Sequence, residues 1–263
     1  MFCQNCGNNL DDNSAFCSNC GSKIEENILQ DLVVIEKPAY EVWGAQLPAV
    51  TLILNKNQSV YTQSGGMTWM SNSIEMSTNA RGGVLKSLGR WISGESIFMV
   101  SYTAKENNQQ ITFASSMPGE IRVFEISSNY EIIAQQGAFL CATQGVEIEI
   151  EVTDIKTGFF GGEGFVLQRY KGDGLVFTEL DGSIKEINLG EGETINVNTG
   201  NVAAFESSVK FSAKMVEGLK NAIFGGEGLF LTTLTGPGKI WLQTISVADF
   251  CDKIDPFLSL ESE

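Results

Sequence analysis

The chain repeats one pattern three times, and this repetition constrains its fold more than any other feature. Three segments align on a glycine, and apolar residues lie five positions before it and nine and eleven positions after it. The aligned residues are Val60, Gly65, Ile74 and Met76 in the first copy, Ile132, Gly137, Val146 and Ile148 in the second, and Ile195, Gly200, Val209 and Phe211 in the third. Apolar residues two positions apart are typical of strands with one buried face. The alignment therefore predicts three tandem copies of one β-rich unit of about 65 residues.

A second block follows the first in each copy and contains one glutamate. The stretches SGESIFMVSY, GGEGFVLQRY and GGEGLFLTTL align on Glu95, Glu163 and Glu227. Threefold pseudo-symmetry would gather these carboxylates around one axis, where they would bind a hard cation or raise one another's pKa values. Alternatively, each glutamate accepts backbone N–H bonds within its own glycine turn. A phosphate-binding loop is not expected, because GGEG leads into a strand and lacks a following Lys-Ser/Thr pair.

Two connections show the spacing of short amphipathic helices, over residues 81–92 and 213–224. Apolar residues precede the glutamate block in all three copies. They are Trp91, Ile92, Phe159, Phe160, Ile223 and Phe224. These residues either pack between the subdomains or form a patch that binds a partner.

Four cysteines near the N-terminus follow the spacing C-x2-C-x10-C-x2-C. They are Cys3, Cys6, Cys17 and Cys20. Each pair lies in a tight Asn-Gly turn, and two facing turns supply four thiolates in a tetrahedron, the closed geometry of one structural zinc ion. Two disulfides or a redox pair are the alternatives, and the absence of an export signal disfavours them. The remaining Cys141 and Cys251 have apolar neighbours and are expected to be buried thiols.

These patterns predict an all-β fold. It comprises three tandem subdomains, resembling β-sandwiches or double-stranded β-helices and related by pseudo-threefold symmetry, with one or two short amphipathic helices and an N-terminal zinc ribbon. The predicted divisions are a ribbon over 1–22, a linker over 23–37, a triplicated β domain over 38–250 and a C-terminal tail over 251–263. The repeats are expected over about 38–116, 117–179 and 180–247.

Charge and residue content exclude several classes of function. The net charge is −15, so the chain would repel nucleic-acid backbones and anionic membranes. The sequence contains no histidine, which excludes Ser-His and Cys-His nucleophile pairs and histidine metal sites. Neither a signal peptide nor an apolar run of about 18–20 residues is found, so we expect a cytoplasmic protein.

The stretches QSGGM, QQGAF, LKSLGRWISGES and above all AIFGGEGLFLTTLTGPGKIWLQ resemble the family named for altered inheritance of mitochondria. Its domain is related to the trp RNA-binding attenuation protein, and the resemblance covers about residues 38–250. It implies three tandem β-subdomains with pseudo-threefold symmetry. Because the mitochondrial member is associated with inner-membrane organisation, it also implies a scaffolding role. The resemblance transfers no catalytic or ligand-binding residues, and the zinc ribbon is an addition to the family pattern.

Two functions follow as hypotheses. The first is a non-enzymatic assembly or adaptor protein, whose zinc ribbon and β domain bind protein partners. The alternative is a ligand-binding or hydrolytic β domain that uses Glu95, Glu163 and Glu227. The missing nucleophile constellation favours the first. The sequence leaves open self-association and peripheral association with membrane complexes.

Overall fold

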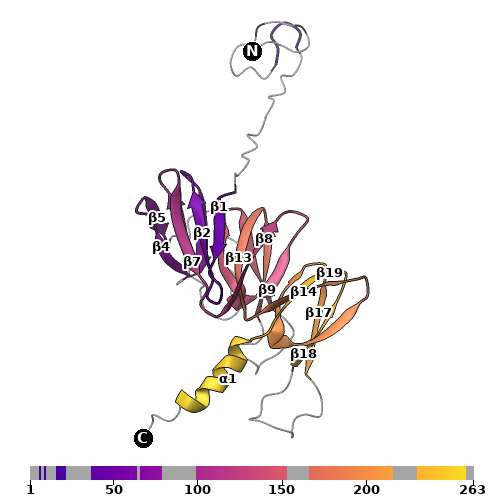
Figure 1. Ribbon diagram of the computed structural model, residues 1–263. Coiled ribbons are helices and arrows are strands. Elements are labelled where there is room, and N and C mark those ends of the chain that lie inside the picture. The colour runs from indigo at the N-terminus through magenta and orange to yellow at the C-terminus, as the bar shows by residue number, and fades with distance from the viewer. Residues whose placement is uncertain are drawn as a thin grey trace. The chain divides into compact units, whose positions relative to one another are not determined.

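The computed structural model describes Cys6, Asn9 and residues 16–21, 37–63, 66–78, 99–152, 166–215 and 230–258. The chain divides into two compact units, Met1–Glu36 and Lys37–Glu263. Almost all the described secondary structure of the second unit is β-strand (Figure 1). This composition confirms the all-β fold.

Six strands recur in the same order in each of the three repeats. In the first repeat they are β2 (Ala49–Leu54), β3 (Ser59–Gln63), β4 (Met67–Met70), β5 (Ile74–Ser77), β6 (Met99–Ala104) and β7 (Gln109–Ala114). In the second they are β8 (Gly119–Ile126), β9 (Ile132–Gln135), β10 (Phe139–Thr143), β11 (Val146–Val152), β12 (Val166–Gly172) and β13 (Gly174–Asp181). In the third they are β14 (Ile184–Leu189), β15 (Thr194–Asn198), β16 (Val202–Glu206), β17 (Lys210–Met215), β18 (Phe230–Thr235) and β19 (Gly238–Gln243). Strand β1 (Ala39–Trp43) precedes them and has no counterpart in the later repeats.

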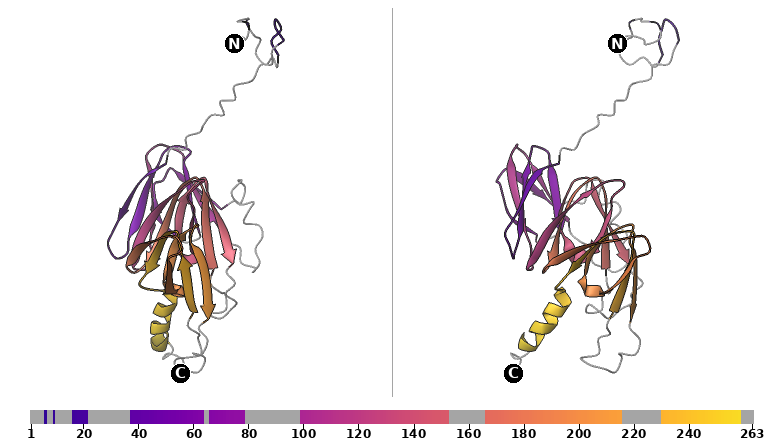
Figure 2. Two further views of the ribbon diagram at one scale, coloured as in Figure 1. Left: turned by 90° about the vertical axis from the view of Figure 1, so that its right-hand side faces the viewer. Right: turned by 45° about the vertical axis from the view of Figure 1, so that its right-hand side comes forward.

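The six strands of each repeat divide between two sheets. The first, sixth and third strands form one half-sheet, and the fourth, fifth and second strands form the other. The second half-sheet of one repeat then continues into the first half-sheet of the next, giving the sheets β5-β6-β3-β10-β13-β8 and β11-β12-β9-β16-β19-β14. The terminal sheets are β1-β2-β7-β4 and β15-β18-β17. Successive repeats therefore share sheets, and Figures 1 and 2 show the sheets succeeding one another through this unit.

An irregularity at the same place in every repeat confirms the alignment made from the sequence. The register between the third and sixth strands shifts at Met67/Trp69, at Phe139/Cys141 and at Val202/Ala204. Each shift follows the aligned glycine by two to four residues. In the later repeats that glycine lies in a short 3-10 helix, over Gln136–Ala138 and Thr199–Asn201. Such bulges bend a strand and re-aim its side chains.

Apolar side chains from facing sheets fill the core. Residues of the first and second repeats share one buried cluster, which includes Leu52, Phe113, Cys141 and Phe177. Cys141 is fully buried in this cluster, and burial raises the pKa of its thiol well above the ordinary value. The expectation of a buried thiol is confirmed at Cys141.

Helix α1 (Val247–Leu258) occupies most of the segment that we expected to be a C-terminal tail. It exposes Cys251, so the expectation of a buried thiol is wrong at this position. Residues 213–215 of one expected helix belong instead to β17, because β17 pairs with β18 over its whole length from Lys210 to Met215. The rest of that segment and the expected helix over 81–92 lie outside the described residues.

The last residue of β13, Asp181, carries a partly buried carboxyl group. Burial, together with the nearby Glu179 carboxylate, raises the pKa of Asp181 to about 6 from its ordinary 3.8. The folded state thus keeps a proton that the unfolded chain releases, so this group destabilises the fold as the pH rises from about 4 to 6.

We therefore expect Asp181→Asn to stabilise the protein above pH 6 by about 1 kcal/mol, a value that allows for solvent screening of this partly exposed side chain. Urea unfolding of both proteins at pH 4 and pH 7 measures the difference. The gain should vanish at about pH 4, and an equal gain at both pH values would contradict this prediction.

Candidate metal centre and surface pocket

Three cysteines of the N-terminal unit lie close enough to bind one metal ion. The sulfur atoms of Cys6, Cys17 and Cys20 all lie within 4.8 Å of one another. The Sγ atoms of Cys6 and Cys17 are 3.6 Å apart. Four sulfurs bound to zinc at about 2.3 Å would be separated by about 3.8 Å, the edge of that tetrahedron. The donor set therefore fits a structural zinc ion, and Cys3, the expected fourth ligand, lies outside the described residues.

The turn around Cys17 and Cys20 explains why these residue types occur at this spacing. The Gly21 N–H donates to the Cys17 carbonyl, and Gly21 adopts a φ of +69°, which favours glycine. The side-chain amide of Asn19 lies 3.6 Å from the Cys6 sulfur as a hydrogen-bond donor. Amide donors of this kind stabilise a thiolate, the form of cysteine that binds metals.

The arrangement gives no support to the disulfide alternative. Cys6, Cys17 and Cys20 form no disulfide with one another. The 3.6 Å between the Cys6 and Cys17 sulfurs far exceeds a bonded S–S distance of about 2.05 Å. Cys17 is buried, whereas Cys6 and Cys20 are exposed. A unit as small as this one typically gains folding free energy from a bound metal.

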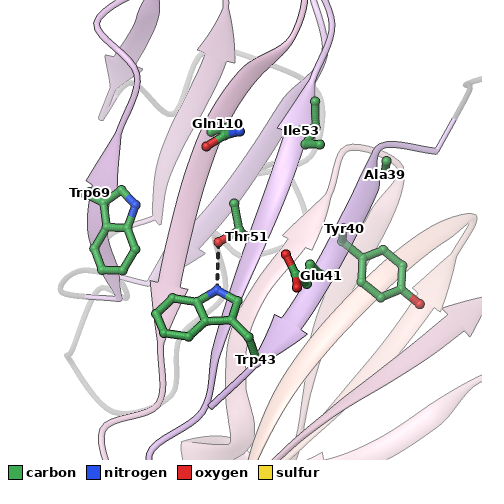
Figure 3. A pocket seen from close by; sticks show the side chains of 8 residues that line it. All are labelled: Ala39, Tyr40, Glu41, Trp43, Thr51, Ile53, Trp69 and Gln110. Atoms are coloured by element: carbon green, nitrogen blue, oxygen red, sulfur yellow. Dashed lines mark hydrogen bonds between the residues drawn. The ribbon is translucent and has the colours of Figure 1, made fainter.

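A pocket of about 310 Å³ opens on the outer face of the first sheet (Figure 3). It is lined by Ala39, Tyr40, Glu41, Trp43, Thr51, Ile53, Trp69 and Gln110. Strand register explains the grouping, since Trp69 lies beside Thr112, Thr112 beside Thr51, and Thr51 beside Glu41. One row across β4, β7, β2 and β1 therefore crosses the pocket.

Two tryptophans dominate this pocket. The rings of Trp43 and Trp69 are 5.8 Å apart with their planes at 38°, and their exposed fractions are 41% and 48%. The indole N–H of Trp43 donates to the Thr51 hydroxyl at 3.0 Å, as the dashed line in Figure 3 shows. That hydroxyl lies 2.9 Å from the hydroxyl of the buried Thr112. The Trp43 ring is thus held in place while much of its surface remains exposed.

Comparison with known proteins assigns both units of the chain. Residues 40–245 match the family described as mitochondrial biogenesis AIM24, and residues 2–24 match a zinc-ribbon domain. The chain belongs to the AIM24 family. This result confirms the resemblance found in the sequence, together with its added zinc ribbon.

Relatives of this AIM24 protein occur in streptococci. An uncharacterized protein of Streptococcus pyogenes serotype M6 is 28% identical over 226 residues, covering 82% of this chain and 89% of its own length. A crystal structure of a Streptococcus pyogenes protein superposes with a TM-score of 0.69 at 24% identity. The match covers 84% of this chain and 100% of that structure. The structural likeness shows a shared fold.

Several predicted site residues of this AIM24 protein lie outside the described residues. These are Glu95, Glu163 and Glu227, and the apolar residues Trp91, Ile92, Phe159, Phe160, Ile223 and Phe224. Whether the glutamates converge on one site stays a prediction. The sequence reasoning missed the pocket, although two tryptophans in short strand-like stretches (YEVWG and MTWMS) could have signalled it.

Two buried tyrosine hydroxyls of the β domain have structural hydrogen-bond partners, whereas the buried side-chain nitrogens Gln63 Nε2, Arg122 Nε and Gln168 Nε2 have none among the described residues. The Tyr61 hydroxyl donates to the Val146 carbonyl at 2.8 Å, and the Tyr170 hydroxyl donates to Gln168 at 3.3 Å. Burial raises the pKa of both hydroxyls, so neither ionises at neutral pH. No helix in the described part of the chain is long and apolar enough to cross a membrane.

Proposed function

We propose that this AIM24 family member is a non-enzymatic assembly protein of the cytoplasm that binds protein partners. The observation that carries this proposal is the pair of exposed tryptophans, Trp43 and Trp69, on the outer face of the first sheet. Tryptophan is strongly enriched among residues that dominate protein–protein binding energy. The hydrogen bond to Thr51 already restricts the Trp43 ring. The Trp43 side chain would therefore lose little conformational entropy when a partner contacts it.

The zinc ribbon supplies a second interaction module in this proposal. Its donor set suits a closed structural zinc site, which leaves no open coordination position for catalysis. Phe16 lies immediately before Cys17 and is 59% exposed. An exposed aromatic ring beside a rigid metal site is a suitable contact for a partner.

The alternative, a ligand-binding or hydrolytic domain, draws less support from the described contacts. The chain has no histidine to act as a general base, and the buried Tyr61 and Tyr170 hydroxyls have structural hydrogen bonds. The glutamates on which that alternative depends lie outside the described residues.

Substituting both tryptophans should weaken partner binding by the β domain. We expect Trp43→Ala/Trp69→Ala to weaken binding of a captured partner by at least tenfold, since hot-spot residues each contribute about 2 kcal/mol or more. Affinity isolation from cells would identify the partner, and calorimetry with the purified partner would measure the affinity.

The matched control is Met76→Ala, which removes a 55% exposed apolar side chain on β5, away from the pocket residues. Binding that is unchanged in the double variant, with thermal unfolding showing a folded β domain, would refute the role of the pocket. A chain lacking residues 1–22 measures the ribbon's contribution separately.

A further inference from the structure

Among the described strands, two at the ends of the array lack the neighbour that their counterparts have. In the second and third repeats the third strand pairs with the second strand of the preceding repeat, β10 with β3 and β16 with β9. The third strand of the first repeat, β4, and the second strand of the last repeat, β15, are instead edge strands among the described residues. We call each pairing of a third strand with the second strand of the preceding repeat a junction. The described strands form two complete junctions, and β4 and β15 are the two separate halves of a third.

The composition of the edge strands distinguishes these two from the others. The other six edges, β1, β5, β8, β11, β14 and β17, each contain at least one charged residue. Charged side chains protect exposed edges against pairing with another chain. Strands β4 (MTWM) and β15 (TINVN) contain no charge and no proline. In this respect they resemble β3, β9 and β10, three of the four strands that pair between repeats inside the chain, whereas the fourth, β16, contains Glu206.

The internal junctions also define the register that a third junction would adopt. At one junction Ala142 pairs with Tyr61, and at the other Phe205 pairs with Ile133. The shared bulge makes Met70 equivalent to Ala142 and Phe205, and the aligned glycines make Asn196 equivalent to Tyr61 and Ile133. The expected partners are therefore Met70 with Asn196, and Ser71 with Ile195.

We propose that β15 of one copy pairs antiparallel with β4 of a second copy, joining the terminal three-stranded and four-stranded sheets into one. The two halves lie at opposite ends of the array, with the second repeat between them (Figures 1 and 2). This placement favours pairing between copies over closure within one chain. Each copy has one of each edge, so the association is head-to-tail and forms either a ring or a filament. It goes beyond the proposed partner binding, because it uses backbone edges and a second copy of the same chain.

Disulfide trapping between two different variants tests this pairing. Full-length Met70→Cys and Asn196→Cys chains are mixed and mildly oxidised, and peptide mass spectrometry identifies the bridge between positions 70 and 196. Directly paired residues have Cα atoms about 4.5–5.5 Å apart, which suits a disulfide. We expect a covalent dimer containing this bridge in the mixture and its absence from either variant alone.

The controls distinguish the proposed pairing from random collisions between chains and from pairing of β4 with β15 within one chain. Asn196→Cys mixed with Ala39→Cys, on the charged edge strand β1, should give at least tenfold less bridged dimer. If Met70→Cys or Asn196→Cys does not fold, a second pair, Ser71→Cys with Ile195→Cys, repeats the test at the neighbouring register position. Absence of the bridge in both mixtures would overturn the proposal, as would a bridge within single chains of the Met70→Cys/Asn196→Cys double variant. Light scattering of the wild type should give a mass above the 28.6 kDa of one chain.

Discussion

Replacing Cys17 by serine is expected to abolish zinc binding and to unfold the ribbon while the β domain stays folded. Cys17 is 2% exposed, and its sulfur lies 3.6 Å from that of Cys6. Structural zinc contributes about 10–16 kcal/mol to the folding of such small units, so we expect the ribbon to unfold without its metal. Metal analysis should find about one zinc per wild-type chain and less than about one tenth of that in the variant.

The control for this experiment is Cys251→Ser, which changes an exposed thiol on α1 and should leave the zinc content unchanged. Since the ribbon and the β domain are separate compact units, the thermal unfolding of the β domain should also be unchanged in Cys17→Ser. A wild-type chain without bound metal would contradict the proposed zinc site.

Replacing Phe177 by alanine is expected to destabilise the β domain by about 3–5 kcal/mol, the usual cost of removing a buried aromatic ring. Phe177 on β13 is fully buried in the cluster that the first and second repeats share. Its ring contacts Tyr40 of β1 edge-on, with the ring centroids 5.1 Å apart. The cavity would therefore open between two repeats. Urea unfolding followed by tryptophan fluorescence measures the loss.

Phe250→Ala is the matched control, because that ring on α1 is 42% exposed and its loss should cost less than about 0.5 kcal/mol. Since neighbouring repeats share sheets, we also expect Phe177→Ala to lower a single cooperative transition. A separate early transition for one part of the β domain would show that the repeats unfold independently.

The repeat pattern predicted the core of the β domain well where strands have the same neighbours. Five positions before the aligned glycine, Val60 and Ile132 are fully buried, and nine positions after it Ile74, Val146 and Val209 are buried. Eleven positions after it, however, Ile148 is buried whereas Met76 is 55% exposed. Both residues fit the same alternation, and what differs is the packing around β5 and β11, which the local sequence does not specify.

A local pattern predicted the cysteine cluster, whereas the pocket and helix α1 were not predicted. The cysteine spacing predicted the cluster that Cys6, Cys17 and Cys20 form, because a tetrahedral site needs two short pairs. The pocket combines Trp43 of the unrepeated β1 with Trp69 of a bulged strand, and only the register of four strands brings them together. Helix α1 was expected to be a tail, and it contains Pro256, a residue that is disfavoured in helix interiors.

The sharing of sheets between repeats has a consequence for how such a chain could evolve. Each internal boundary is made by the same strand pairing, of β3 with β10 or of β9 with β16. An ancestral duplication that added a repeat would have reproduced this pairing without requiring a new interface, and it would have left the same kind of edge at either end. The number of repeats could therefore have changed in single genetic steps, each leaving a foldable protein.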